Sequence, residues 1–315
     1  MGDRPDWKTQ WRRASVLALG ILLALSLSVL RPMPVLAVAP EWSAAGSLLI
    51  PGLGQGLNGD WGYAPVHLGV YLGLANNYYK AIDDPDYIEW EDREDETDNT
   101  IRINKASADA DMWGAALGNW ALYSSFGAYR DGRALPENGG YSTPVPEESL
   151  TDLALSPFNP EFLFRPTVLI PLLFPLFYVF TPADSQTWLY KPDSTITRGE
   201  LRQQAFLMHD MVAVGEEGFF RGVLNNSMSS AWGPWWGLAA SSTVFGLAHS
   251  GTAGTANPLS AAAFGAYLGW RQQRNEYAIG EGVALHYWWN VLVTLAALRE
   301  RPTPAFRIAT FALRF

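Results

Sequence analysis

The 315-residue chain contains no cysteine and only four histidines. Without cysteine, disulfide bonds, thiolate nucleophiles and cysteine-based metal sites are excluded. Charged residues are also scarce at 17%, whereas a typical soluble domain has about 25%. The net charge is −9, and no basic cluster of useful size exists outside the N-terminus. The sequence therefore argues against a nucleic-acid partner.

Hydrophobic residues are plentiful, at 48% of the chain, and Trp, Tyr and Phe number 14, 13 and 15. Aromatic side chains of this abundance suit the belts at membrane–water interfaces. Apolar stretches of helical length recur along the chain. The sequence predicts an all-α fold, a polytopic membrane helix bundle of about seven to eight transmembrane helices, with membrane lipid as its surroundings.

Residues 1–39 have the features of a signal peptide or signal anchor. Basic residues precede an apolar run at residues 14–30, and the small-x-small triplet from Ala37 to Ala39 follows. This order is typical of an export signal, although an uncleaved anchor has the same features, and cleavage stays open. In either case the basic end is expected in the cytoplasm.

Residues 40–130 are expected to form an N-terminal membrane hairpin region. Apolar stretches at residues 42–53 and 61–79 flank a turn at residues 58–60, and a further span is expected at residues 106–129. The acidic loop at residues 80–100 is expected to be solvated. Its spacing fits no calcium loop, because the required Gly and terminal Glu are missing.

The second half divides into three expected units. Residues 131–160 read as a linker, and residues 161–190 as a transmembrane helix kinked by Pro171 and Pro175. Residues 198–300 form the compact core. Its helices are expected at residues 199–224, 232–250, 258–270 and 282–298, with breaks at residues 225–227, 233–234 and 271–275.

Three short motifs of the core place polar groups inside apolar helices, where charge is costly and indicates function. The first contains Glu216, Glu217 and Arg221. Glu217 and Arg221 are four residues apart and share a helix face, so we expect a buried ion pair that supports the site. Glu216 has no such ion-pair partner by spacing. Desolvation of a lone carboxylate makes it more basic, which suits a general base.

The second motif ends an apolar helix at His249, and the third places His286 and Asn290 four residues apart on one helix face. His286 and Asn290 can both donate hydrogen bonds into one cavity, as an oxyanion requires, and neutral donors avoid burying a permanent charge. The three motifs together supply a base, a group that orients water and two oxyanion donors. Ser227, Ser229 and Ser230 have no matching base by spacing, which disfavours a serine mechanism.

Taken in order, E-E-x-x-x-R, F-x-x-x-H and H-x-x-x-N resemble the CPBP family of intramembrane proteases, which includes CAAX prenyl endopeptidases and Abi-type bacteriocin-processing relatives. The resemblance implies an intramembrane endopeptidase of a bacterial inner membrane. It makes Glu216 and His249 the pair that activates water, His286 and Asn290 the oxyanion donors, and Glu217 and Arg221 the support. The expected substrate is a membrane-associated or leader-bearing peptide.

Several alternatives stay open at this stage. Glu216, His249 and His286 are able to bind zinc as two His and one carboxylate, although no H-E-x-x-H motif is present. The chain could instead be a non-catalytic scaffold or immunity protein of the same fold, or a proton-coupled transporter. His67 and His209 match no motif and are interpreted as structural. The sequence leaves the oligomeric state open.

Overall fold

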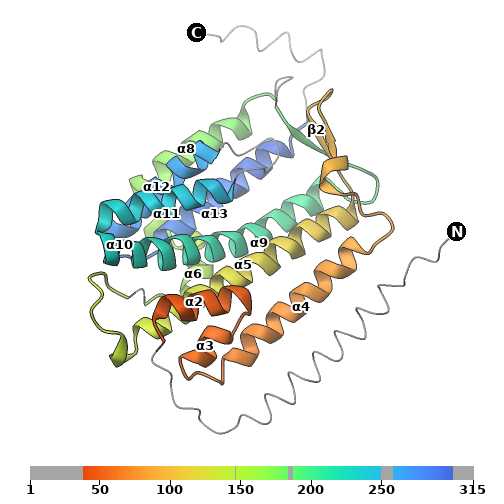
Figure 1. Cartoon of the computed structure of the whole chain (residues 1–315). Helices are drawn as coiled ribbons and strands as arrows, with labels where there is room; N and C mark the ends of the chain where they lie inside the picture. Colours follow the sequence, from red (N-terminus) through yellow and green to blue (C-terminus); the bar gives the residue numbers. More distant parts are fainter. Residues whose placement is uncertain (1–37, 146, 184–186, 250–257, 301–315) are drawn as a thin grey trace, which may run out of the picture.

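The computed structural model describes residues 38–145, 147–183, 187–249 and 258–300. The predicted signal segment therefore lies outside the described residues, apart from its last two positions. The described part is mostly helical (Figure 1), which confirms the helical part of the fold prediction. Among these residues, no helix is both long enough and apolar enough to cross a membrane. The membrane-spanning part stays a prediction.

The N-terminal half contains short helices, a small hairpin and two long helices. In chain order these are α2 (Pro40–Leu49), α3 (Leu53–Leu57), α4 (Ala64–Ile82), η1 (Trp90–Asp92), β1 (Glu94–Asp95), β2 (Thr100–Ile103), α5 (Lys105–Arg133), η2 (Pro136–Asn138), α6 (Leu150–Leu155), η3 (Ser156–Phe158) and α7 (Pro160–Leu163).

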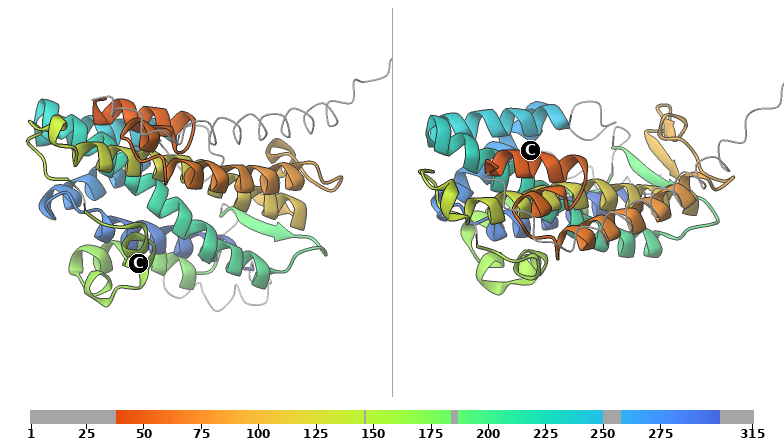
Figure 2. Two further views of the ribbon diagram at one scale, coloured as in Figure 1. Left: turned by 90° about the horizontal axis from the view of Figure 1, so that it is seen from below. Right: turned by 60° about the horizontal axis from the view of Figure 1, so that its bottom comes forward.

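The C-terminal half carries the three motifs. Its elements are α8 (Pro166–Phe180), β3 (Leu189–Pro192), α9 (Arg198–Glu216), η4 (Glu217–Asn225), α10 (Asn226–Trp232), α11 (Pro234–Ala248), α12 (Pro258–Arg274) and α13 (Gly280–Ala297). In Figure 2, two further views show the helices lying side by side in an elongated bundle, with the strands at one end.

A three-stranded sheet, which the sequence analysis does not predict, joins the two halves. Strand β2 pairs antiparallel with β1 and parallel with β3, in the order β1-β2-β3. Strand β2 leads into α5 and β3 leads into α9, so the two helices start side by side (Figure 1). The side chains of Asn104 and Thr197 cap these helices by accepting a main-chain N–H three residues on. The sheet thereby fixes where α9 begins.

Glycines let α5 and α9 approach closely. A Cβ on Gly215 would lie 2.6 Å from the main-chain oxygen of Asn119, and one on Gly222 would overlap the ring of Phe126. Phe126 is fully buried in the core that α5, α9, η4 and α13 share. Because a larger residue at either position would push the helices apart, these glycines set the position of the intervening Glu216 and Glu217 relative to α5.

The segment Pro51-Gly52-Leu53-Gly54-Gln55 packs against α5. The side-chain amide of Gln55 donates to the carbonyl of Ser124 (2.9 Å), and that of Asn58 donates to the carbonyl of Ala128 (2.7 Å). Hydroxyls of Ser43 and Ser47 donate to Asn58 and Gln55, both at 2.7 Å. These four side chains bond to one another and to the α5 backbone, which supports a structural role for the segment.

The predicted helix break at residues 225–227 is wrong. The chain continues without interruption from the π-helix η4 into α10. Asn225 and Asn226 are fully buried, where Asn225 donates to Gln272 (2.6 Å) and Asn226 accepts from Arg133 (2.6 Å). Tertiary hydrogen bonds therefore replace the turn that the two asparagines suggest. The break at residues 233–234 is confirmed, because Gly233 has a φ of 87°.

The acidic loop is exposed as expected but is more ordered than a solvated loop. Arg93, the one basic residue between Asp83 and Asp98, is 1% exposed and lies 2.7 Å from Asp111 of α5, while its Nε donates to the carbonyl of Ile88. The loop also forms η1 and β1. The segment expected as a linker, residues 131–160, contains η2, α6 and η3, and the helix expected at residues 161–190 is confined to α8, with both prolines inside it.

Candidate active site

Glu216 lies where the helix geometry changes. It is the last residue of α9, and the next nine residues, Glu217–Asn225, form the π-helix η4. Stretches of π-helix are rare and frequently occur at functional sites. The Glu216 side chain is 17% exposed, and its Oε2 is buried and accepts no hydrogen bond within the described part of the chain. A buried carboxylate oxygen with no such partner can accept a hydrogen bond or a proton from a bound reactant.

Glu217 contacts two cationic or polar partners in the protein interior. Its Oε1 lies 2.8 Å from Nδ1 of His286 and 3.1 Å from Nη1 of Arg221. All three side chains are at most 4% exposed. The Arg221 contact is an ion pair whose geometry is not that of a hydrogen bond, and the guanidinium also stacks 4.2 Å from the ring centre of Phe245. Glu217 therefore supports His286 as well as Arg221.

The ring orientations of both histidines follow from their partners. Nδ1 of His249 lies 2.8 Å from the main-chain oxygen of Phe245, which can only accept, so this nitrogen carries the proton. Nδ1 of His286 likewise donates to the Glu217 carboxylate. In the neutral rings, both Nε2 atoms therefore carry lone pairs. As a neutral ring, His286 cannot donate from Nε2, contrary to the neutral oxyanion donor expected from the sequence.

The two Nε2 atoms converge on Glu216. Oε2 of Glu216 lies 3.7 Å from Nε2 of His249 and 3.8 Å from Nε2 of His286. These distances are too long for direct hydrogen bonds. Three acceptor atoms so close together need a proton donor or a cation between them. A water molecule, with two protons to donate, meets that need and would be polarised by the carboxylate.

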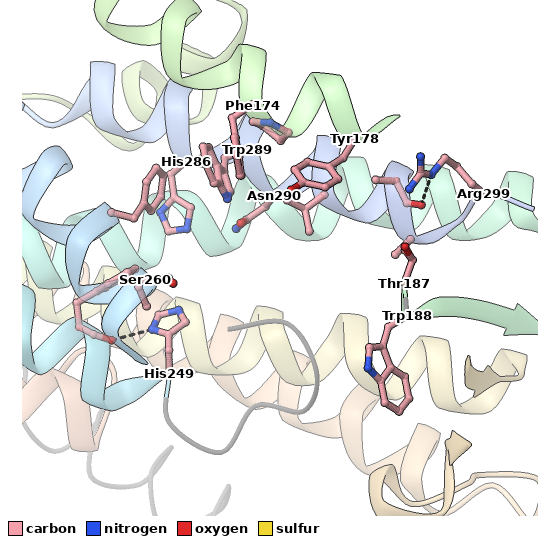
Figure 3. A pocket seen from close by; sticks show the side chains of 17 residues that line it. Phe174, Tyr178, Thr187, Trp188, His249, Ser260, His286, Trp289, Asn290 and Arg299 are labelled. Atoms are coloured by element: carbon pink, nitrogen blue, oxygen red, sulfur yellow. Dashed lines mark hydrogen bonds between the residues drawn. The ribbon is translucent and has the colours of Figure 1, made fainter. Parts of the chain in front are cut away.

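Asn290 completes the group from the same face of α13. It lines one cavity together with His249 and His286, and its side chain points into that cavity (Figure 3). The cavity measures about 760 Å³. Most of its other lining is apolar and aromatic, with contributions from α8, α11, α12, α13 and the segment before β3: Phe174, Pro175, Tyr178, Thr187, Trp188, Phe245, Ser260, Ala261, Phe264, Trp289, Val293, Ala296, Ala297 and Arg299. An apolar cavity with a few convergent polar groups is the usual form of a ligand site.

A metal ion is the alternative occupant of this group. Within residues 38–145, 147–183, 187–249 and 258–300, no group of three or more His, Cys, Asp or Glu side chains has the geometry to hold one. Two imidazoles oriented by a carbonyl and a carboxylate nevertheless have the outer partners that metal-bound histidines use. Zinc at Glu216, His249 and His286 therefore remains an expectation for metal analysis.

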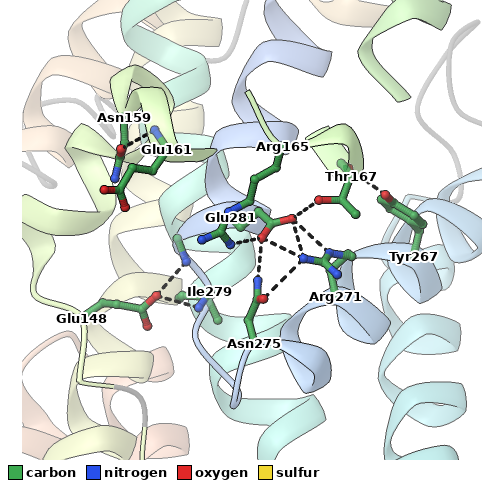
Figure 4. A network of polar contacts seen from close by, with 11 residues as sticks. Glu148, Asn159, Glu161, Arg165, Thr167, Tyr267, Arg271, Asn275, Ile279 and Glu281 are labelled. Atoms are coloured by element: carbon green, nitrogen blue, oxygen red, sulfur yellow. Dashed lines mark hydrogen bonds and ion pairs between the residues drawn. The ribbon is translucent and has the colours of Figure 1, made fainter. Parts of the chain in front are cut away.

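A second carboxylate, Glu281, holds the start of α13 in place. Because His286 lies on the same helix, Glu281 also fixes the position of His286 along the cavity. Its oxygens accept from Thr167 (2.6 Å) and Arg165 (2.6 Å) on the α8 side, and from Arg271 (2.9 Å) and Asn275 (2.7 Å) on the α12 side (Figure 4). Charge-assisted bonds of this kind are the strong ones. The network ties α8, α12 and α13 together at the end of the cavity helices.

Glu148 holds the same helix end from the loop before α6. Its Oε1 accepts from the main-chain N–H groups of Ile279 and Gly280, both at 2.8 Å. Burial raises the pKa of this carboxyl, against the opposing effect of the two hydrogen bonds. Since a helix N-terminus carries unsatisfied N–H groups, Glu148 acts as a cap supplied from elsewhere in the chain.

The remaining candidates have structural partners. Nε2 of His209 lies 2.7 Å from the Thr294 hydroxyl, and His67 packs against the rings of Trp120 and Tyr123. Ser227 donates to Glu41 (2.7 Å), Ser229 to Asn225 (3.3 Å), and Ser230 contacts Ser142. None of these contacts involves the cavity groups.

Sequence reasoning missed two contributions to the site. One is the carbonyl of Phe245, which sets the tautomer of His249, and its only signal is the i, i+4 spacing of the second motif. The other is the lining from outside the core, such as Trp188 just before β3. No local pattern marks Trp188, because only the sheet brings it to the cavity.

Comparison with known proteins gives one match. Residues 201–292 match the family model described as Rce1-like, type II CAAX prenyl endopeptidase. The matched segment is less than a third of the chain and contains all three motifs. No curated protein and no solved structure matches. The match confirms the resemblance to the CPBP and CAAX protease family over this segment.

Proposed function

We propose that this protein is an intramembrane endopeptidase that hydrolyses peptide bonds with water activated by Glu216 and His249. The observation that carries the proposal is the convergence of two imidazole Nε2 atoms, at 3.7 and 3.8 Å, on Oε2 of Glu216, which accepts no hydrogen bond from the residues that the structure describes. The family match at residues 201–292 supports a CAAX-type protease at the family level.

The first step is attack by water. Glu216 Oε2 takes one proton from the water, and Nε2 of His249 accepts a hydrogen bond from the other, which orients the oxygen toward the substrate carbonyl carbon. As the new C–O bond forms, the carbonyl π electrons move to its oxygen and give a tetrahedral oxyanion. The proton stays on Glu216 until the amine leaves.

The oxyanion is then stabilised from α13. The amide of Asn290 donates in any protonation state. His286 donates from Nε2 only as an imidazolium, which must take its extra proton from solvent before the water attacks, and the Glu217 carboxylate 2.8 Å from its Nδ1 is the counter-ion that stabilises this form. The C–N bond breaks as the Glu216 proton passes to the leaving nitrogen, which restores the carboxylate.

A membrane location for this chemistry is supported by the outer face of the helices. The side chains of Ile170, Phe177 and Phe180 on α8 are 66%, 65% and 79% exposed, and Trp235 and Trp236 on α11 are 73% and 71% exposed. Water-soluble monomers rarely expose apolar side chains in such a continuous series. We place the protein in a bacterial inner membrane, with lipid around these helices and a membrane-associated or leader-bearing peptide in the aromatic cavity.

Glu216→Gln is the variant that tests the proposal. An amide cannot take the proton from water, so cleavage should fall by about 10²-fold or more while the fold is kept. Peptides released from membranes that contain wild-type or variant protein are compared by mass spectrometry. Glu96→Gln, an exposed acid of the loop, is the matched control and should behave as wild type.

Unchanged cleavage by Glu216→Gln would refute the mechanism. A phenotype that persists without any cleavage would favour the scaffold hypothesis, and pH-dependent flux into liposomes would favour the transporter. Stoichiometric zinc that is lost in His249→Ala or His286→Ala would assign the metal-dependent form of the same hydrolysis.

A further inference from the structure

A second cavity lies between the end of α4 and the acidic loop, apart from the proposed active site. It measures about 370 Å³ and is lined by Tyr78, Ile82, Tyr87, Glu89 and Trp90. The loop borders the sheet that precedes α9, whereas Glu216 ends α9 (Figure 1). With 19 residues, α9 is about 28 Å long at 1.5 Å per residue, so Glu216 lies far from the sheet end where the second cavity opens, and the two cavities share no lining residue.

The lining combines three aromatic rings with one carboxylate. The face of an aromatic ring carries partial negative charge, and rings grouped around a small cavity attract organic cations. Trp90 and Glu89 come from the loop and Tyr78 from the last turns of α4, so helix and loop hold the cavity together from two sides. Glu89 is exposed and pairs with no cation among the residues that the structure describes.

Two of the rings already accommodate a cation inside the protein. The guanidinium of Arg93 lies 5.7 Å from the ring centre of Tyr87 and 5.3 Å from that of Trp90. Arg93 is 1% exposed, is neutralised by Asp111 at 2.7 Å and does not line the cavity. This buried cation holds both rings in place and leaves the charge of Glu89 uncompensated at the cavity.

The surrounding charge favours a cation over an anion or a neutral ligand. Exposed acids lie close in sequence to the residues that line the cavity: Asp83, Asp84, Asp86 and Asp92. Arg93 is the only basic residue between Asp83 and Asp98. A metal ion fits poorly, because Ca²⁺ takes six to eight oxygen ligands and the lining supplies one carboxylate. An organic cation needs only the rings and one negative charge.

We propose that this cavity binds an organic ammonium ion, such as a trimethylammonium group, between the rings of Tyr78, Tyr87 and Trp90 and the carboxylate of Glu89. The group could come from a lipid headgroup or from a small free molecule, since both present the same chemistry. The site is independent of the proposed peptidase activity and needs none of its residues.

The test is calorimetric titration of the purified full-length chain in phosphatidylglycerol nanodiscs with choline. The neutral isostere of choline, 3,3-dimethylbutan-1-ol, has the same shape without the charge. Choline should bind saturably and the isostere should not. Trp90→Leu should weaken choline binding roughly two- to fivefold, the range for a single exposed cation–π contact. Glu89→Gln should weaken it by roughly two- to fivefold as well, through the loss of an exposed ion pair. Glu96→Gln, an acid of the same loop that does not line the cavity, should leave binding unchanged.

Phosphatidylcholine nanodiscs identify the source of the cation. If the lipid headgroup fills the cavity, added choline should no longer bind in these discs, and if a free molecule is the ligand, binding should persist. The proposal fails if choline does not bind in phosphatidylglycerol discs, if the isostere binds equally well, or if Glu89→Gln changes nothing. Because Glu89 is exposed, that variant keeps the fold even if Trp90→Leu does not.

Discussion

The two histidines of the proposed site differ in the protein group that each contacts through Nδ1. Each histidine uses Nδ1 to contact the protein, His249 to a carbonyl and His286 to a carboxylate. The two supports are not equivalent, because only a carboxylate stabilises an imidazolium. His249 is therefore suited to accept a hydrogen bond from water, and His286 is suited to meet the oxyanion as an imidazolium protonated beforehand from solvent.

Glu217→Gln tests this division of roles. The amide keeps a hydrogen bond to His286 but removes the counter-ion, so kcat should fall by about 10²-fold or more with little change in KM. The same change leaves Arg221 buried without its ion-pair partner, which costs about 3–5 kcal/mol of unfolding free energy. Both quantities are measurable on the purified protein, by peptide cleavage and by thermal unfolding.

The double variant Glu217→Gln/Arg221→Met separates the two effects. Removing the guanidinium should restore much of the lost stability, because no unpaired charge stays buried. Activity should stay low, since His286 still lacks its counter-ion. Recovery of activity together with stability would mean that Glu217 has a purely structural role.

Among the elements, the contact between α5 and α9 determines the position of the first motif. Gly215 lies against the backbone of Asn119 and Gly222 against the buried ring of Phe126, and Glu216 and Glu217 lie between them in sequence. Neither neighbour is the end of a flexible side chain. A shift of α9 along this contact would move Glu216 away from the histidines on α11 and α13, so packing and geometry of the site are coupled.

Gly215→Ala should therefore destabilise the protein by about 1–3 kcal/mol, as overpacking does, and should also reduce cleavage. Gly118→Ala on α5 is the matched control, because a Cβ at that position meets nothing within 4 Å. An alanine inside a helix is favoured over glycine by about 1 kcal/mol, so this variant should be stabilised. Thermal unfolding measures the stability of both variants. Equal changes in unfolding free energy would contradict the close contact at Gly215.

At this scale the sequence predicts some features well and others poorly. Hydrophobic runs and prolines place a helix within residues 161–190, where α8 spans Pro166–Phe180, and the i, i+4 spacings place Glu217 with Arg221. The asparagines at 225 and 226 mislead, because their side chains bond to α12 and α5 instead of to their own backbone. The sheet is invisible to local patterns, since β2 pairs with β3 across an intervening stretch that contains α5 and α8.

For the whole molecule, the absence of cysteine makes the membrane proposal directly testable. Single cysteines are introduced by Phe177→Cys on α8, Trp236→Cys on α11 and Glu96→Cys in the acidic loop. In opened membrane vesicles, a charged maleimide should label the loop position within minutes, and the two helix positions only after detergent is added. Labelling of all three at equal rates in the intact bilayer would contradict a lipid-facing α8 and α11.

The pairing of Glu217 with Arg221 also affects the order of events while the chain is synthesised. These two residues leave the ribosome four positions apart, whereas His286 follows Glu217 by 69 residues. Opposite charges one helical turn apart offset each other as soon as their own segment is helical, which lowers the cost of burying either one. Until α13 has been synthesised and docks, Glu216 has neither His286 nor Asn290 beside it. The nascent chain can therefore bury Glu217 and Arg221 together early, and the group around Glu216 is complete only when α13 docks.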